Sequence, residues 1–292
     1  MKPPPFAYHA PESLAECLDV LHQLGDDGKV LAGGQSLVPL LNLRLARPAH
    51  LIDLNAVQEL GAIEPWDGGV RVGALVRQRT AERSDLIRRR CPLLAEALPL
   101  IGHPQIRNRG TIGGSLAHAD PASELPAVAT ALDAQLVVRN ANRERTVDAE
   151  AFFVSFFTTS MEPDELLTEV RFPAWPASSG WSYLEVSRRH GDFAMVGVAS
   201  VLRLGPNGTI AEARLAYTGA APAPVRARDA ERQLMGQSPN EATFTQAAEA
   251  AARALDPQSD VHASAAYRRH VAKALTRQAL AQAAERAHGG AA

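Results

Sequence analysis

Two pairs of adjacent glycines mark the residues around which a binding site could form. Gly33 and Gly34 lie in the segment VLAGGQSLVP, at residues 30–39. Gly113 and Gly114 lie in the segment IRNRGTIGGSLAHADPASELP, at residues 106–126. Because glycine has no Cβ, such pairs reach positive φ values and allow the backbone to approach a bound group closely. Successive N–H groups in such a segment can converge on an anion.

Both segments are typical of phosphate-binding loops that lack a lysine. We predict that they are the two halves of one site, in which backbone N–H groups and the hydroxyls of Ser36, Thr111 and Ser115 hold the phosphates. Two tight turns at strand ends remain the alternative, because glycine pairs commonly mark turns. The sequence contains neither G-x-G-x-x-G opening a helix nor G-x-x-x-x-G-K-[ST], so it favours neither a Rossmann site nor a P-loop.

The histidines, cysteines and serines of the chain show no pattern that predicts a metal site or a catalytic residue. His103 and His118 flank the second glycine pair but lack a spacing such as H-E-x-x-H. The only cysteines, Cys17 and Cys91, are too few for an iron–sulfur cluster, which usually needs four cysteine ligands. No serine has the G-x-S-x-G setting of an activated nucleophile.

The composition indicates a globular protein with a substantial core. The 292 residues, 46% of them hydrophobic, are enough for one large or two modest domains. A formal net charge of −2 gives no electrostatic footprint for nucleic acid. The proline-rich start lacks the apolar region of a secretory signal, and no run of 18 apolar residues predicts a transmembrane helix. We therefore expect a cytoplasmic protein.

The elements needed to position the glycine pairs alternate between strands and helices. Helices are predicted at residues 13–24, where Ser13 and Glu16 form a capping box, and at 36–46, 80–90, 93–100 and 126–132. Strands are predicted at 29–32, 51–54, 134–139, 145–147 and 166–172, with a hairpin at 61–75. This alternation indicates a mixed sheet with helices packed on it.

A linker at residues 174–180, AWPASSG, predicts a domain boundary. We expect a first domain at 1–176, divided into 1–55 and 56–176, and a smaller domain at 177–287. The runs 181–186, 194–204 and 210–217 predict a three-stranded antiparallel sheet. Helices are predicted at 228–235, 240–255 and 263–287. The predicted fold class is α+β.

Three motifs give the chain a specific resemblance. AGGQSL at 32–37 and the whole of 106–126 resemble the FAD-binding (medium) subunit of the molybdenum hydroxylases, which include the aerobic carbon monoxide dehydrogenases and xanthine dehydrogenases. A third motif, SRRHGDFAMVGVA at 187–199, resembles a further signature of that family. The resemblance covers nearly the whole chain.

The resemblance implies that both glycine segments wrap the pyrophosphate of a non-covalent FAD. It implies an acidic residue at the adenosine end, here Glu124 where the family often has aspartate, and Phe193 near the flavin ring in place of a frequent tyrosine. Ser115 likewise replaces a frequent asparagine. The full set of implied FAD-binding residues is Ala32, Gly33, Gly34, Gln35, Ser36, Leu37, Ile101, Thr111, Ile112, Gly113, Gly114, Ser115, Glu124 and Phe193. No role is assigned to Arg188, Arg189 or His190.

The implied function is electron transfer by the bound FAD. A large partner subunit would hold a molybdenum–pterin cofactor, and a small partner subunit two [2Fe–2S] clusters, in a dimer of heterotrimers. A self-contained flavin oxidase or reductase remains the alternative, and a scaffold without flavin is disfavoured by the two intact glycine segments. The substrate of the complex and its electron acceptor stay open.

Overall fold

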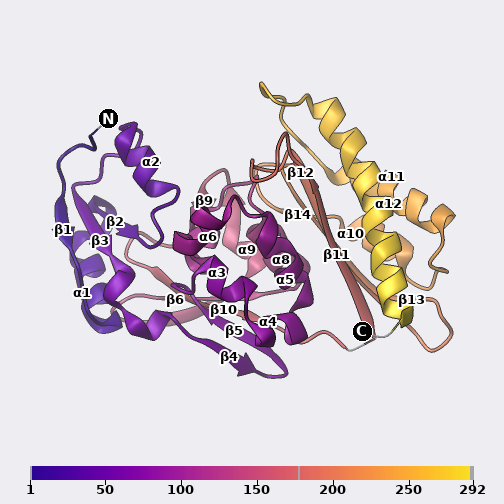
Figure 1. Ribbon diagram of the computed structural model, residues 1–292, viewed down its shortest axis with the longest axis horizontal. Helices are drawn as coiled ribbons and strands as arrows, with labels where there is room; N and C mark the ends of the chain where they lie inside the picture. The colour runs from indigo at the N-terminus through magenta and orange to yellow at the C-terminus, as the bar shows by residue number, and fades with distance from the viewer. Residues whose placement is uncertain (1, 177, 290–292) are drawn as a thin grey trace.

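The computed structural model describes residues 2–176 and 178–289 of the chain. Two sheets with their helices form the N-terminal part, and a third sheet backed by helices forms the C-terminal part (Figure 1). This arrangement confirms the predicted α+β class. Residue 177, inside the predicted linker 174–180, lies outside the described residues.

The first sheet is small, parallel and built by the first 53 residues. Its strand order is β1 (Ala7–His9), β3 (His50–Asp53), β2 (Gly28–Leu31). Helix α1 (Leu14–Leu24) begins as predicted, because Ser13 Oγ accepts from the N–H of Glu16 at 3.2 Å. Its buried face, with Leu21, packs on Ile52 of β3. Helix α2 (Leu37–Asn42) follows the first glycine pair.

The second sheet is antiparallel, and its central strand comes last in the chain. The order is β4 (Ile63–Trp66), β5 (Gly69–Gly73), β10 (Leu166–Phe172), β6 (Gln135–Arg139), β7 (Glu144–Asp148). A two-stranded ribbon, β8 (Phe153–Ser155) and β9 (Thr158–Thr159), lies outside this sheet. The accompanying helices are α3 (Gln78–Glu82), α4 (Asp85–Arg90), α5 (Pro92–Ala97), α6 (Pro104–Arg109), α7 (Ile112–His118), α8 (Glu124–Ala131) and α9 (Ala149–Phe152).

Several predicted helix boundaries in the first domain were wrong. The helix predicted at 80–90 is two helices, α3 and α4, because Ser84 caps the second one by accepting from the N–H of Ile87. The helix predicted at 36–46 ends at Asn42, and Arg44 then takes a positive φ of 59°. Helix α7 lies inside the glycine-rich segment 106–126, and α6 extends into its start, where the sequence indicated a loop.

The third sheet has four strands, one more than predicted. Its order is β11 (Ser179–Val186), β12 (Val196–Leu204), β13 (Ile210–Thr218), β14 (Val225–Arg226), all antiparallel. The two-residue β14 is too short to give a sequence pattern. Helices α10 (Arg228–Leu234), α11 (Glu241–Ala254) and α12 (Ala265–Gly289) follow. Gly180 allows α12 to lie directly on β11, since a Cβ there would be 1.8 Å from the carbonyl oxygen of Ala283.

The two faces of this sheet contribute to different hydrophobic cores. Val198, Leu202 and Leu215 join the core beneath α11 and α12. Tyr183 and Ala199, on the opposite face, join the core of the second sheet and α8. The C-terminal sheet is therefore packed tightly between its own helices and the N-terminal part.

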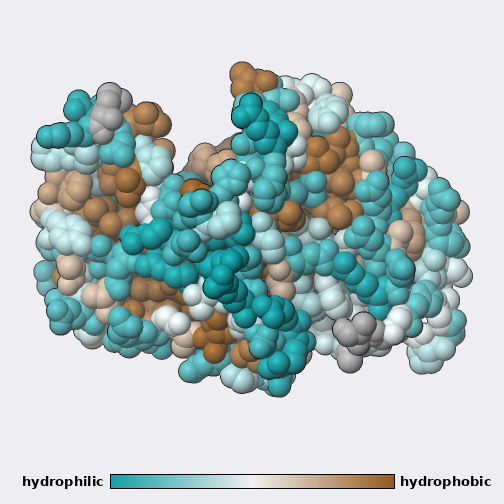
Figure 2. Space-filling model, in the orientation of Figure 1, coloured by the Kyte–Doolittle hydropathy of each residue, from teal (hydrophilic) through white to brown (hydrophobic). Residues whose placement is uncertain are grey.

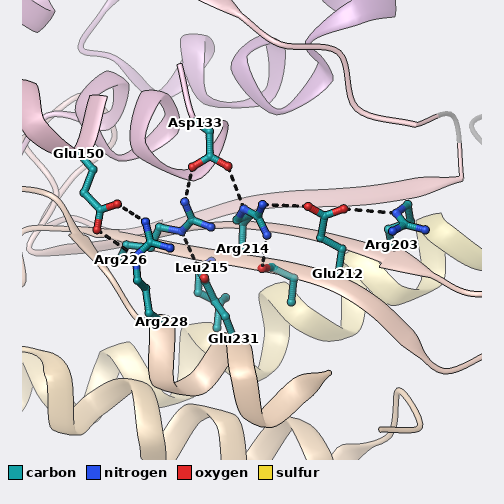
Figure 3. Close-up of polar contacts among 10 residues, drawn as sticks. Asp133, Glu150, Arg203, Glu212, Arg214, Leu215, Arg226, Arg228 and Glu231 are labelled. Atoms are coloured by element: carbon teal, nitrogen blue, oxygen red, sulfur yellow. Dashed lines mark hydrogen bonds and ion pairs between the residues drawn. The ribbon is translucent and has the colours of Figure 1, made fainter. Parts of the chain in front are cut away.

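A chain of ion pairs joins the two parts at this seam (Figure 3). Asp133, directly after α8, accepts from Arg214 of β13 at 3.0 Å and also pairs with Arg226 of β14. Arg226 pairs in addition with Glu231 at 2.8 Å, and its side chain is 3% exposed. Glu150 of α9 pairs with Arg228 nearby. Asp133 is thus a shared partner of two cations on the C-terminal sheet.

The surface on the face shown in Figure 2 is mainly hydrophilic. Its outline is notched between the lobe that carries α2 and the C-terminal domain. Among residues 2–176 and 178–289, no helix is both long enough and apolar enough to cross a bilayer.

Candidate functional site

The first glycine pair forms an open turn between β2 and α2. Gly34 has a positive φ of 74°, which accounts for glycine at this position. The carbonyl oxygen of Gly34 accepts from the N–H of Val38 at 3.0 Å and starts the helix. In the described chain, the N–H groups of Gly33, Gly34, Gln35 and Ser36 have no hydrogen-bond acceptor. Four consecutive donors are therefore free to bind an external acceptor, as the sequence predicted for this segment.

The second glycine pair differs from the prediction, because it lies in the first turn of α7. Thr111 is the N-cap, and its Oγ1 accepts from the N–H of Gly114 at 2.9 Å. The N–H of Ile112 donates to Val76, and the N–H of Gly113 donates to Ala74, both at 2.9 Å. Neither glycine has a positive φ. The N–H groups of Ile112, Gly113 and Gly114 therefore already have acceptors within the protein, unlike those of the first segment.

Glycine is needed in the second segment for close packing. A Cβ on Gly113 would lie 2.4 Å from the Cβ of Ala74. A Cβ on Gly114 would lie 2.6 Å from Thr111 Oγ1 and 3.5 Å from the Cβ of Ala32. Ala32 of the first segment is therefore next to the second segment.

The two segments meet most closely at Gly33. A Cβ on Gly33 would lie 2.3 Å from the carbonyl oxygen of Arg109 and 2.8 Å from the Cα of Gly110. The predicted association of the two segments, 80 residues apart in sequence, is thus present in the structure. What the sequence did not reveal is that backbone packs directly on backbone at this point.

A cavity of about 320 Å³ opens beside the first segment. Its lining combines two glycines, apolar residues, one acidic residue, two amide residues and one arginine: Leu31, Ala32, Gly33, Gly34, Gln35, Val38, Pro39, Asp53, Asn55 and Arg109. The Asp53 carboxylate is already bonded, to the Tyr8 hydroxyl at 2.7 Å and to the N–H of Asn55 at 2.9 Å. Arg109 is the basic residue of this lining, next to the free N–H groups.

Sequence reasoning missed Arg77, Asn55, Asp53 and Arg109. Arg109 lies within the motif at 106–126, but its position beside the other segment depends on the tertiary fold. Asp53 ends β3, which runs parallel to β2, and Asn55 lies in the turn directly after it, so polar residues at that strand end were the available signal. Burial, together with the neighbouring Arg109, lowers the pKa of the Arg77 guanidinium.

Glu124 lies away from this cavity, at the seam with the C-terminal sheet. Its side chain is 3% exposed, and burial with the nearby Glu185 raises the pKa of its carboxyl to about 8. Burial also raises the pKa of Glu185 to about 7. Tyr183 Oη and Glu185 Oε2 are buried without a hydrogen-bond partner among the described residues. Burial and the neighbouring Glu185 therefore favour the neutral form of the Glu124 carboxyl.

Ile101 and Phe193 are brought to one region by the loop between β11 and β12. Gly191, with a φ of 87°, places its backbone on His103: a Cβ there would lie 2.5 Å from His103 Cε1. The rings of His103 and His190 are 6.1 Å apart. Ile101 is buried just before His103, whereas Phe193 is 61% exposed. The exposed ring of Phe193 is thus available to pack on another group.

Three further predicted residues lie in helices α7 and α2. Ile112 is fully buried in the core, so its side chain points away from the surface of the second segment. Ser115 lies in α7, and its hydroxyl makes no hydrogen bond in the described chain. Leu37 is the first residue of α2.

Comparison with known proteins identifies both parts of the chain. Residues 4–175 match the family described as the FAD binding domain in molybdopterin dehydrogenase. Residues 181–283 match the CO dehydrogenase flavoprotein C-terminal domain. Among the described residues, no group of three or more His, Cys, Asp or Glu side chains is arranged to hold a metal ion.

Relatives match along their whole length. The chain is 44% identical to the 6-hydroxypseudooxynicotine dehydrogenase complex subunit alpha of Paenarthrobacter nicotinovorans, covering 98% of this chain and 97% of that one. It is 40% identical to the carbon monoxide dehydrogenase medium chain of Hydrogenophaga pseudoflava, covering 96% and 97%.

Solved structures agree with this assignment. The carbon monoxide dehydrogenase structure from Hydrogenophaga pseudoflava superposes with a TM-score of 0.95 at 42% identity, over 98% of this chain and 99% of that one. The quinoline 2-oxidoreductase structure from Pseudomonas putida 86 gives 0.93 at 38% identity, over 98% and 99%. The resemblance indicated by the three motifs is therefore confirmed, and the chain belongs to the family of FAD-binding medium subunits of the molybdenum hydroxylases, as an oxidoreductase component.

Proposed function

We propose that this chain is the electron-transfer flavoprotein of a molybdenum hydroxylase, which takes electrons from [2Fe–2S] clusters of a partner subunit and passes them to an external acceptor. When bound, FAD supplies the redox chemistry, and the protein supplies binding and orientation. The observation that carries the proposal is the row of free N–H groups at Gly33–Ser36, next to Arg109 and in contact with the second glycine segment.

The residues present fit a pyrophosphate. Four successive N–H donors and the nearby Arg109 complement a dianion, and the Asp53 carboxylate of the same cavity is oriented by its hydrogen bonds from the Tyr8 hydroxyl and the N–H of Asn55. We propose that the first segment, Ala32 to Leu37, donates to the phosphates through its N–H groups. The second, Thr111 to Ser115, then forms the opposite wall and offers the Ser115 hydroxyl.

The flavin end is proposed to lie toward the C-terminal domain. Phe193 offers an exposed aromatic face, and Ile101 lies on the neighbouring loop. Glu124 is next to Tyr183 and Glu185 of the C-terminal sheet rather than in the cavity lined by Asp53 and Asn55. We therefore propose that Glu124 contacts the cofactor on its flavin side, and that Asp53 and Asn55 border the adenosine side.

Partner subunits follow from the same proposal. With two cysteines, the chain cannot supply the four ligands that a cluster usually needs. We propose a large molybdenum–pterin subunit and a small iron–sulfur subunit, in a dimer of heterotrimers located in the cytoplasm. We also propose a domain boundary at 176/177, which the matches at 4–175 and 181–283 support.

Purification of the tagged full-length chain from its source cells tests this function. We expect two further chains together with iron and molybdenum in fixed ratio to flavin. A yellow protein that purifies alone, without metals, and that turns over a small substrate would replace the proposal with a self-contained flavin oxidase or reductase.

A further inference from the structure

Arg77 lies between the two glycine segments and touches both. It directly precedes α3 and forms an isolated antiparallel bridge with Thr111, the N-cap of α7. The next residue, Gln78, donates its N–H to the carbonyl oxygen of Gly110 at 2.8 Å. The backbone around Arg77 is therefore already fixed against the second segment.

One arm of the Arg77 guanidinium acts on the first segment through Asn55. Nη2 donates to Asn55 Oδ1 at 2.6 Å. Because this bond occupies the amide oxygen, the amide nitrogen of Asn55 points the other way, and Nδ2 donates to the carbonyl oxygen of Ala32 at 3.1 Å. Ala32 directly precedes Gly33. Arg77 thus orients the amide that anchors the start of the first segment.

The other arm acts on the second segment directly. Nη1 donates to the carbonyl oxygen of Arg109. This is the carbonyl that a Cβ on Gly33 would approach to 2.3 Å. One planar guanidinium therefore holds both segments at the point where they meet.

We propose that Arg77 is a positioning residue for the dinucleotide site, which sets the spacing of the two glycine segments through Asn55 and the Arg109 carbonyl. The proposal rests on the FAD site proposed above. Arg77 is partly buried, and its guanidinium makes no ion pair within 4 Å among the described residues, although the charge of Asp53 is near enough to oppose the lowering of its pKa by burial. Its donors are instead used on backbone and amide oxygens of the two segments, which is where a geometric role would use them.

Substitution by lysine separates geometry from charge. Lysine keeps the positive charge but is a compact point donor, and it cannot make two bonds in the fixed directions of the guanidinium fork. The variants are Arg77→Lys, Asn55→Ala and the double variant. Arg71→Lys is the matched control, because among residues 2–176 and 178–289 the Arg71 side chain bonds only to the exposed Glu64 of the adjacent strand. Each full-length protein is deflavinated and measured for its FAD dissociation constant, its melting temperature and its amide hydrogen exchange.

We expect Arg77→Lys to weaken FAD binding by tenfold or more, whereas Arg71→Lys changes it less than twofold. In the deflavinated Arg77→Lys protein, amide hydrogen exchange should be faster than in deflavinated wild type at both residues 32–36 and residues 109–114. Adding Asn55→Ala should weaken binding by less than threefold further, because both changes break one pathway.

Three results would overturn the inference. Wild-type FAD affinity in Arg77→Lys would assign the role to charge. Accelerated exchange throughout the domain, with a matching loss of melting temperature, would assign it to general folding. Full additivity of the double variant would remove Asn55 from the pathway. Failure of the wild-type chain to bind FAD would be a different result, which overturns the proposed function and this inference with it.

Discussion

Substitution of Gly33 by alanine tests the contact between the two glycine segments. The added Cβ would lie 2.3 Å from the Arg109 carbonyl oxygen, 2.8 Å from the Gly110 Cα and 2.9 Å from the Arg109 carbonyl carbon. All three neighbours are backbone atoms, so no flexible side chain can move aside. The segments must separate by about 1 Å to reach ordinary van der Waals contact.

Two effects of this separation can be estimated. Overpacking of this kind typically destabilises a protein by about 1–3 kcal/mol. The free N–H groups of Gly33–Ser36 also move relative to Arg109, which lies on the other side of the contact. Misaligning one hydrogen bond to a charged phosphate weakens binding by roughly 1.5–3 kcal/mol, which is about tenfold to a hundredfold in the dissociation constant of FAD.

The assay is a fluorescence titration of the deflavinated full-length chain with FAD, alongside urea unfolding of the same samples. Gly61→Ala is the matched control. Gly61 lies in the same domain with a negative φ, and a Cβ there would meet only Gln58, at 3.3 Å from its carbonyl oxygen. The control should bind FAD within threefold of wild type.

An FAD affinity in Gly33→Ala equal to that of wild type would refute this reasoning, because the segments would then tolerate separation. Equal losses in Gly33→Ala and Gly61→Ala would refute it as well, since binding would follow general stability instead of the contact.

Three further predictions concern the seam and the flavin side. The pKa of Glu124 is raised to about 8 in the folded state, so the folded state loses stability relative to the unfolded state as pH rises from about 5 to 8. The unfolding free energy of Glu124→Gln, measured in urea, should therefore increase relative to that of wild type by at least about 1 kcal/mol between those pH values. A difference that stays constant with pH contradicts this prediction. Asp133→Asn should lower the unfolding free energy by about 1 kcal/mol, because the buried Arg226 loses one of its partners. Glu144→Gln, which breaks the exposed pair with Arg139, is the control and should lower it by less than about 0.5 kcal/mol. Equal losses in the two variants would contradict a special contribution of the ion pairs at the seam. Phe193→Ala should shift the visible absorption maximum of bound FAD, and an unchanged spectrum would place the ring elsewhere.

Elements with strong local patterns could be predicted from the sequence. The capped leucine pattern of α1 and the apolar runs of β12 and β13 are local, so they survive in the fold. The first glycine pair also behaves as predicted, because positive φ and free N–H groups are properties of a short segment.

The second glycine pair could not be interpreted correctly in isolation. Two glycines and a threonine are typical of a loop, yet Thr111 caps a helix whose first N–H groups donate to Ala74 and Val76. Those acceptors come from a segment almost 40 residues earlier in the chain. Long-range backbone pairing therefore overrode the local preference of glycine.

The polar network around the site was not predictable for the same reason. Arg77 and Asn55 belong to no motif, and their roles depend on which carbonyls the fold brings within reach. The raised pKa of Glu124 likewise comes from burial at the seam, with a further contribution from Glu185 of the C-terminal sheet. The motifs identify the site, but its geometry depends on tertiary contacts between residues that are distant in the sequence.

Amide hydrogen exchange of the deflavinated full-length chain, with and without saturating FAD, tests the central claim most directly. The claim is that the two glycine segments form one FAD site, with the N–H groups of Gly33–Ser36 as its donors. We predict rapid exchange of these four amides without FAD, strong protection with FAD, and a simultaneous slowing across residues 111–115. Unchanged exchange at residues 33–36 in the presence of saturating FAD would contradict the account.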